Sequence, residues 1–431
     1  MPQTDDQTPT STPARGPSRV ASMLALIVAG EAIFGLPFVV VRLFRPTLLD
    51  VFGITNLELG SAFSVYGVLA MIAYVPGGPL ADRYSPRWLM ALALIATALG
   101  GLVYMQIPSA TTLTLLFGYW GVTTILLFWS PLIRATRNWG GDDAQGRAFG
   151  ILDGGRGLFA AALGSVCVAL FSAMLPEDAK TATLEQRGDA LAMVIVCFTI
   201  GTIVAAVLVW FLIPDGERET KDAPAADRSQ IWRNIGLVAR NRAVWLQTLI
   251  VLTAYTGYKS LDDFSLYARD AFGFDDVAAA KVGTLALWVR PVAAIVAGVV
   301  GDRVGVARAV LVCFAITCVG NLVVAAGMLD PGMPWMLFTM VVTTSGMVFG
   351  LRGLYFALFR DAKVDPALTG TAAGMVSVLG YTPDVFVGPL NGYLTDAYPG
   401  ATGHEYFFGS IAVFSALGLL SAIAFNRAAK A

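Results

Sequence analysis

The chain has 431 residues, of which 56% are hydrophobic and only 14% charged. Soluble domains are usually about 45–50% apolar and about 25% charged, so a water-soluble fold is excluded. The 29 basic and 30 acidic side chains nearly balance, which leaves no basic surface for a nucleic acid. Twelve membrane-spanning helices would use about 240 residues, and the length therefore suits a polytopic transporter.

The N-terminal residues 1–18 are rich in Pro, Thr, Ser and Gln and contain no apolar stretch. This pattern predicts a disordered cytoplasmic tail and not a signal peptide. The four cysteines lie inside apolar runs without CxxC spacing and are expected to pack as small apolar side chains. Since the sequence has no P-loop, metal-ligand set or nucleophile with a base, we expect neither a cofactor nor enzymatic activity.

Twelve apolar stretches of about 20 residues, bounded by glycine, proline or charge, predict transmembrane helices. In chain order they cover residues 20–45, 60–81, 88–107, 112–135, 148–175, 190–213, 242–268, 278–300, 307–329, 334–360, 368–394 and 404–425. A polar stretch, residues 214–241, follows the sixth. We therefore predict an all-α membrane fold with two six-helix bundles, residues 19–213 and 242–431, joined by a cytoplasmic linker.

The basic residues outside these spans predict how the chain crosses the membrane. Most of them fall on one side if both termini share that side, and a shift of one span would reverse the distribution. The positive-inside rule then puts both termini in the cytoplasm. We expect an integral protein of the plasma (inner) membrane.

The two predicted bundles share a motif at a constant spacing. Gly78-Pro-Leu-Ala-Asp82-Arg83 follows the second span, and Gly298-Val-Val-Gly-Asp302-Arg303 follows the eighth, 220 positions later. The same offset relates two Val-Thr-Thr segments, at 122–124 and 342–344. A shared offset at separate places predicts a duplicated six-helix unit.

The segment GGPLADRYSPR, residues 77–87, closely resembles the G-x-L-a-D-r-x-G-r-r signature of the major facilitator superfamily. With its degenerate copy at 298–303, the resemblance covers essentially the whole chain after the tail. It implies two pseudo-symmetric bundles of six helices that rock about a site at the membrane midplane. One departure is Ser85-Pro86 in place of the usual second glycine.

The resemblance also implies a cytoplasmic latch that forms when that side is closed. Asp82 would meet the start of span eleven near Thr369, and Asp302 the start of span five near Arg147. A purely topological role for these charges is the alternative. The predicted latch and gating residues are Asp82, Arg83, Arg87, Arg134, Asp302 and Arg303.

A narrower likeness is to the organophosphate:phosphate antiporters, which include the glycerol-3-phosphate/phosphate exchanger. The matching segments are Val41-Arg42, residues 81–87 and Trp129-Ser-Pro-Leu-Ile-Arg134. In that family an arginine of span one and another of span seven grip the phosphate. Arg42 matches the first, whereas the second position falls near Gly257, two residues before Lys259.

Charges inside apolar spans cost about 2.5–3.5 kcal/mol each on insertion scales, and they usually face a cavity or the bundle interior. Arg42 can offer its planar guanidinium to a carboxylate, phosphate or sulfonate, although snorkelling beside Arg45 is the alternative. Arg290, in the middle of span eight, can supply a second cation. The predicted substrate-binding residues are Arg42, Arg290, Lys259, Arg352, Tyr258 and Trp129.

Acidic residues within the spans are the candidates for ion coupling. Lys259, Asp262 and Asp263 stand at i, i+3 and i+4, so both carboxylates can reach the ammonium along one helix face. Residues 153 and 156 are an Asp and an Arg at i, i+3, for which helix packing is the alternative. The predicted coupling residues are Glu31, Asp153, Asp262, Asp263 and Asp384.

Together these features predict a monomeric secondary active transporter that moves a small organic anion across the lipid bilayer, with a proton or phosphate as the co- or counter-ion. Arg42 and Arg290 would draw the two bundles together on the anion. The alternatives are a proton-coupled exporter of hydrophobic or cationic compounds and a non-transporting membrane receptor. His404, the single histidine, is expected at the surface, at the outer edge of span twelve.

Overall fold

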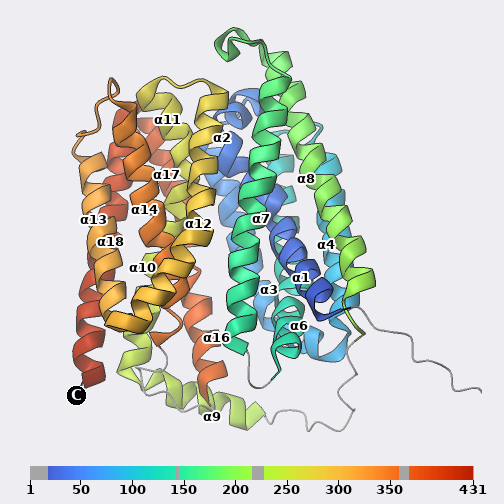
Figure 1. Cartoon of the computed structure of the whole chain (residues 1–431), viewed down its shortest axis with the longest axis vertical. Coiled ribbons are helices and arrows are strands. Elements are labelled where there is room, and N and C mark those ends of the chain that lie inside the picture. The colour runs from blue at the N-terminus through green and yellow to red at the C-terminus, as the bar shows by residue number, and fades with distance from the viewer. Residues whose placement is uncertain (1–17, 142–144, 216–227, 359–367, 431) are drawn as a thin grey trace, which may run out of the picture.

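The computed structural model describes residues 18–141, 145–215, 228–358 and 368–430. Its helices form two bundles that stand side by side, with the first half of the chain on the right and the second half on the left of Figure 1. The helix α9 (Arg228–Ala239) lies at one end of the molecule, and α11 (Phe264–Phe272) lies at the other. We call these the α9 end and the α11 end.

The first half contains eight further α-helices. They are α1 (Arg19–Phe34), α2 (Val40–Phe52), α3 (Asn56–Arg83), α4 (Pro86–Tyr104), α5 (Ala110–Thr124), α6 (Ser130–Gly140), α7 (Gln145–Ala173) and α8 (Leu184–Leu212). Short π-helical segments, η1 (Gly35–Val39) and η2 (Ile125–Trp129), join α1 to α2 and α5 to α6. A 3-10 turn, η3 (Ala179–Thr181), precedes α8.

The second half repeats this arrangement. Its helices are α10 (Arg242–Ser260), the 3-10 turn η4 (Leu261–Asp263), α11, α12 (Asp276–Val304), α13 (Val306–Ala325), α14 (Pro334–Leu354), α16 (Thr369–Gly380), α17 (Pro383–Ala397) and α18 (Ala401–Lys430).

All twelve predicted spans coincide with these helices. In the described part of the chain, ten helical stretches are long and apolar enough to cross a membrane. The other two spans are divided, the seventh by η4 between α10 and α11 and the eleventh at residues 381–382 between α16 and α17. Irregular backbone at membrane depth is tolerated where it lines a cavity, and at the second break the N–H groups of Tyr381, Thr382 and Asp384 keep backbone hydrogen bonds.

Helix ends recur at the same spacing as the sequence motif. Gly53 ends α2 in the left-handed region (φ 59°), and Gly273, 220 positions later, ends α11 in the same way (φ 66°). A glycine at these positions avoids the clash of a Cβ in that conformation. Thr55 caps the start of α3 and Asp275 the start of α12. The predicted repeat therefore extends to the local structure of the chain.

Apolar side chains cover the outer faces of both bundles. Leu92, Ile95 and Leu99 are each at least half exposed on α4, as are Ile295 and Val296 on α12. Apolar surface on this scale marks a face that meets lipid or a partner. Together with the hydrophobic spans it identifies an integral membrane protein.

The predicted linker between the bundles contains a helix. Residues 216–227 lie outside the described part, but α9 forms within the stretch that we predicted to be solvated. Val238 of α9 is buried in the apolar core of the second half. The linker therefore packs against the second bundle at its end.

The two halves are sealed together at the α11 end, where α3 packs against α17. A Cβ on Gly60 would lie 2.3 Å from the carbonyl oxygen of Gly388, and one on Gly392 would lie 2.4 Å from that of Asn56. The two backbones thus touch without side chains between them. Asp396 accepts hydrogen bonds from the backbone and side-chain N–H groups of Asn56 (both 3.1 Å). We call Gly60, Gly388 and Gly392 the glycine seam.

At the α9 end the predicted latch is not engaged. Asp82 and Asp302 are exposed, and neither carboxylate has an ion-pair partner among the described residues. Arg147, the predicted partner of Asp302, is exposed as well, and the side chain of Thr369 lies outside what the structure describes. With the glycine seam in contact and the latch apart, the two halves are closed against each other at the α11 end and not at the α9 end.

The remaining residues of the predicted latch have other surroundings in this conformation. Arg134 donates a hydrogen bond to the carbonyl oxygen of Ala81 (2.6 Å), and Arg87 pairs with Asp215. Arg83 lies over the ring of Tyr84, and Arg303 is exposed. Three of these cations therefore lie in the first half and Arg303 at the end of α12, and no ion pair between them and the opposite half is seen among the described residues.

Substitution of Gly60 by Ala is expected to open the glycine seam. The new methyl group would collide with the backbone of α17, and such overpacking costs about 1–3 kcal/mol. The measurement is the distance between spin labels at the exposed positions Ser61 and Tyr393, in a variant whose native cysteines are serine. We expect a longer distance in Gly60→Ala than in wild type.

Gly78→Ala is the matched control, because a Cβ at Gly78 on the same helix meets nothing within 4 Å. It should leave the distance between the labels unchanged. An unchanged distance in Gly60→Ala would show that the seam tolerates a methyl group and is not the closing contact.

Candidate functional site

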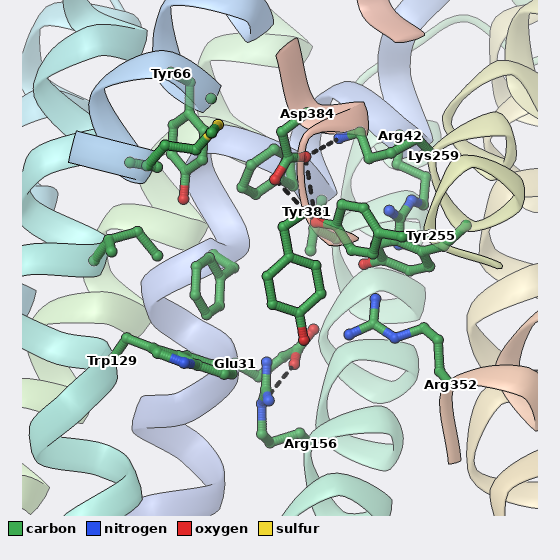
Figure 2. A pocket seen from close by; sticks show the side chains of 18 of the residues that line it. Glu31, Arg42, Tyr66, Trp129, Arg156, Tyr255, Lys259, Arg352, Tyr381 and Asp384 are labelled. Atoms are coloured by element: carbon green, nitrogen blue, oxygen red, sulfur yellow. Dashed lines mark hydrogen bonds and ion pairs between the residues drawn. The ribbon is translucent and has the colours of Figure 1, made fainter. Parts of the chain in front are cut away.

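A cavity of about 100 Å³ lies between the two bundles (Figure 2). Helices α1, α2, α3 and α7 and both π-helical segments line it from the first half, and α10, α12, α14 and α17 from the second. All six predicted substrate-binding residues face this cavity: Arg42, Trp129, Tyr258, Lys259, Arg290 and Arg352. The six residues chosen from the sequence therefore line one cavity, and their role in binding stays a prediction.

Toward the α11 end, two cations and two carboxylates form a closed set. Arg42 Nε lies 2.6 Å from Asp262 Oδ1, and Lys259 Nζ lies 3.1 Å from Asp262 Oδ2. Lys259 Nζ also lies 3.4 Å from Asp384 Oδ1, and the Tyr255 hydroxyl donates to Asp384 (3.0 Å). We call Arg42, Lys259, Asp262 and Asp384 the upper layer, which is electrically neutral. Figure 2 shows three of them near its top.

Toward the α9 end, a second set has the same balance. Glu31 accepts from Arg290 (3.2 Å) and lies 3.3 Å from Arg156 Nε. Arg290 also pairs with Asp153 (3.1 Å), whose side chain is 48% exposed. We call Glu31, Asp153, Arg156 and Arg290 the lower layer. Because Arg290 comes from the second half and the others from the first, this layer joins the two bundles.

Arg352 stands between these layers without a carboxylate. Its Cζ lies 3.9 Å from the ring centroid of Tyr258 and 5.7 Å from that of Tyr255. Among the described residues no acidic group lies within ion-pair distance of it, and its guanidinium points into the cavity in Figure 2. Its charge is stabilised by aromatic rings, which are weaker partners than a carboxylate.

The expectation that Arg42 and Arg290 together grip a substrate needs correction. Both line the cavity, but each is already paired, Arg42 with Asp262 and Arg290 with Glu31 and Asp153. An unpaired charge in a buried site is strongly destabilising, so it takes whatever counter-charge the fold supplies. The two arginines tie the halves together in this conformation, and the charge of each is already matched by a carboxylate.

Two further expectations are wrong. Asp263 does not reach Lys259, because the turn η4 aims it away from the cavity, and its Oδ2 lies 2.6 Å from Nδ1 of His404. His404 is not at the surface; its side chain is fully buried. Hydropathy put this histidine near the end of a span but gave no sign of the two aspartates around it.

Aromatic rings form much of the cavity wall. Phe34 packs edge-on against Trp129 (centroids 6.1 Å apart), and Phe38 packs against Tyr66 (4.7 Å). Arg156 lies 5.8 Å from the Trp129 ring. The cavity thus combines charged ends with walls that can stack on an apolar or planar molecule.

Several cavity residues were not predicted as binding residues. From the sequence, Arg156 was interpreted as the partner of Asp153 in an ion pair that serves helix packing. The glycines beside Arg156 were the signal that neighbouring helices approach closely there. The aromatic residues gave no signal, since a ring facing a cavity and a ring in a core follow the same spacing. The aromatic lining residues that sequence reasoning missed are Phe34, Phe38, Tyr66, Tyr74 and Tyr381.

The fold and this central cavity define a membrane transporter. The family model described as "Major Facilitator Superfamily" matches residues 27–382. The chain belongs to this superfamily of membrane transporters, and it is not an enzyme.

Two curated relatives come from Escherichia coli (strain K12). The chain is 26% identical to "Inner membrane protein YqcE" over 377 residues, 86% of each chain. It is 24% identical to "Inner membrane protein YihN" over 408 residues, 92% of this chain and 93% of the relative. Both names agree with an integral protein of the inner membrane.

Solved structures share the fold. A bacterial homologue of the human lysosomal transporter Spinster, in an inward-facing and unoccupied conformation, superposes with a TM-score of 0.71 and 15% identity, covering 96% of this chain and 99% of that one. The nucleoside transporter NupG gives a TM-score of 0.66 at 15% identity, covering 94% of this chain and 97% of that one.

The charge balance of the lower layer can be tested by a double-mutant cycle. Glu31→Gln leaves an excess positive charge and Arg290→Gln an excess negative one, and each should destabilise the protein by about 3–5 kcal/mol. The double variant is neutral again, so its loss should be well below the sum of the two. The measurement is the free energy of unfolding by denaturant titration in detergent.

Glu185→Gln, on the exposed first turn of α8, is the control and should change stability by less than about 0.5 kcal/mol. Additive losses in the double variant would contradict the paired arrangement.

Proposed function

We propose that this protein is a secondary active transporter for a small organic anion with one negative charge, and that Arg352 binds the anionic group. The observation that carries the proposal is the unmatched guanidinium of Arg352 between two neutral layers of charge. The site then becomes neutral only when an anion is bound.

The number of charges supports one negative charge on the substrate. Five basic side chains line the cavity, and four carboxylates contact four of them. A net charge of one in a poorly hydrated site attracts a counter-charge strongly. A cationic substrate would add a second unmatched positive charge, so the alternative of a cation exporter is disfavoured.

Arg42 can assist Arg352 in this proposal. Its Nη2 is buried and has no hydrogen-bond partner among the described residues, although its Nε is bound to Asp262. Both guanidinium groups lie over the ring of Tyr258, Arg42 at 4.9 Å and Arg352 at 3.9 Å. An anion beside this ring could accept hydrogen bonds from both bundles at once, since Arg42 belongs to the first half and Arg352 to the second.

The rest of the substrate would lie against the aromatic walls. Carboxylates and sulfonates carry one negative charge and suit a guanidinium. A phosphate monoester carries about 1.5 to 2 negative charges at pH 7 and so exceeds the single unmatched charge, but the likeness to organophosphate:phosphate antiporters keeps it among the probes. Membership in that narrower group stays a prediction, because its second arginine position falls near Gly257.

The predicted orientation in the membrane indicates from which side the cavity is open. If both termini are cytoplasmic, the sealed α11 end faces outward. Solvent then reaches the cavity from the cytoplasmic side, where the Asp153 side chain of the lower layer is 48% exposed. Rocking of the bundles would then open the glycine seam and engage the latch at Asp82. Binding of the anion would favour this change, because it supplies the charge that the cavity lacks.

Arg352→Gln is expected to lower uptake by proteoliposomes about 10- to 100-fold, the effect of losing a hydrogen bond to a charged group. Benzoate, glycerol-3-phosphate and benzenesulfonate are the anionic probes. They are first ranked by thermal stabilisation of the purified protein, with uridine as a neutral probe and tetraphenylphosphonium as a cationic one. Uptake of the highest-ranked anion is then compared between wild type and variant.

Arg308→Gln is the matched control, because Arg308 is exposed and lies outside the cavity lining. It should transport as wild type does. Equal uptake by Arg352→Gln and wild type would remove Arg352 from the site. Stabilisation by tetraphenylphosphonium alone would favour the cation exporter instead.

A further inference from the structure

A second buried cluster of charge surrounds His404, between the central cavity and the α11 end. The ring of His404 lies between two carboxylates of its own half: Nδ1 is 2.6 Å from Asp263 Oδ2, and Nε2 is 3.2 Å from Asp270 Oδ2. The side chain of His404 is 0% exposed and that of Asp263 is 1% exposed. We call these three residues the histidine cluster.

The geometry of the histidine cluster requires a bound proton. A neutral imidazole has one N–H donor and one lone pair, whereas carboxylate oxygens only accept. Both ring nitrogens face carboxylate oxygens, so both contacts are hydrogen bonds only if one more proton is present. That proton makes the ring an imidazolium or converts one aspartate to its acid.

The histidine cluster contacts the closed interface between the halves. Arg45 of α2 lies 3.7 Å from Asp263 Oδ1, and it donates to Asn391 of α17 (2.6 Å) and to Asn56 of α3 (3.1 Å). Asn56 is also the residue that the glycine seam brings against Gly392. The charge on the cluster therefore acts directly on the contact that closes the α11 end.

A hollow at the surface gives water access to this cluster. Asp270 lines it together with Thr55, Thr395 and Asp396, and the side chain of Asp270 is 22% exposed. His404 lies directly behind Asp270 and is shielded from solvent. A proton can therefore pass from the hollow to Asp270 and on to the ring without opening the seam.

The same turn connects the cluster to the substrate cavity. Asp262 and Asp263 are adjacent in η4 and face opposite ways, Asp262 to Arg42 and Lys259 and Asp263 to His404. A movement of η4 that follows a change at His404 must therefore move Asp262 in the upper layer.

We propose that the histidine cluster is a proton-binding site, and that its bound proton stabilises the closed α11 end of the transporter. In the closed state the cluster is buried, so loss of the proton leaves a ring lone pair against a carboxylate in a poorly screened environment. In the open state water can hydrate both aspartates. The proton is therefore held more tightly in the closed state, and raising the pH favours opening.

The other charged groups near the ring are consistent with this direction. Arg269 binds the outer side of Asp270 (3.0 Å) and, with Arg187, pairs with Asp50. Tyr267 packs on the ring at 5.2 Å. The region includes five carboxylates, Asp50, Asp263, Asp270, Asp276 and Asp396, against three permanent cations, Arg45, Arg187 and Arg269, so a proton on His404 reduces an excess of negative charge.

The experiment measures closure without any substrate, so its outcome is independent of the proposed anion. Full-length protein in lipid nanodiscs carries the spin labels at Ser61 and Tyr393, and their distance is recorded from about pH 5 to about pH 9, the range in which histidine clusters commonly titrate. In wild type we expect the short distance to dominate at low pH and a longer distance to grow as the pH rises.

His404→Gln cannot bind the proton and should give a distance distribution that no longer changes with pH. Asp270→Asn removes one of the two negative charges that face the ring, so its transition should move by about one pH unit to lower pH. Glu405→Gln is the matched control, since Glu405 neighbours His404 on α18 but makes no contact with the ring among the described groups, and it should behave as wild type.

A wild-type pH response in His404→Gln would overturn the proposal, and so would opening at low pH in the wild-type protein. If His404→Gln does not fold, Asp270→Asn decides alone: an unshifted transition would exclude the cluster as the proton site.

Discussion

A buried charge is costly without a counter-charge, and this cost determines how the two halves meet. Arg42 and Arg290 come from different halves, and each finds its carboxylate in the other half. A buried pair contributes little net stability, but breaking one partner away is costly. The ion pairs therefore specify the relative position of the bundles more than they strengthen the fold, and, among the cations that line the described cavity, Arg352 is left without a counter-charge.

The ion pair of Arg42 and Asp262 has a special place in the duplicated architecture. These residues are 220 positions apart, the spacing that also relates Gly53 to Gly273 and Thr55 to Asp275. Equivalent positions of two repeats can touch only near the axis that relates the repeats. One of the two equivalent positions holds a cation, Arg42, and the other an anion, Asp262. The two repeats are therefore joined near their axis by an ion pair between equivalent positions.

The sequence was sufficient for the fold because the signals involved are local. Twenty-residue apolar stretches, the motif around Asp82 and its copy around Asp302 each lie within a few turns of helix. The cavity lining was also predictable in part, because a charged side chain inside a span usually faces the bundle interior or a water-filled cavity. The choice of Arg42, Lys259 and Arg352 needed no tertiary information.

The partners of these charges could not be predicted, because they are far apart in the chain. Glu31 and Arg290 are 259 positions apart, and His404 and Asp263 are 141 apart. Nothing local to Asp263 shows that the 3-10 turn points it away from Lys259. The same limit explains why a histidine at the edge of a span was expected in contact with solvent.

The glycine seam has a consequence for the speed of opening. Helices in lipid gain no hydrophobic energy by associating and rely on close van der Waals contact, which Gly60, Gly388 and Gly392 allow between bare backbones. At these glycines backbone meets backbone, so few rotamers need to be reordered there when the helices part, and little conformational entropy changes. The two helices can separate as rigid rods, which leaves the polar contacts at their ends to set the kinetic barrier.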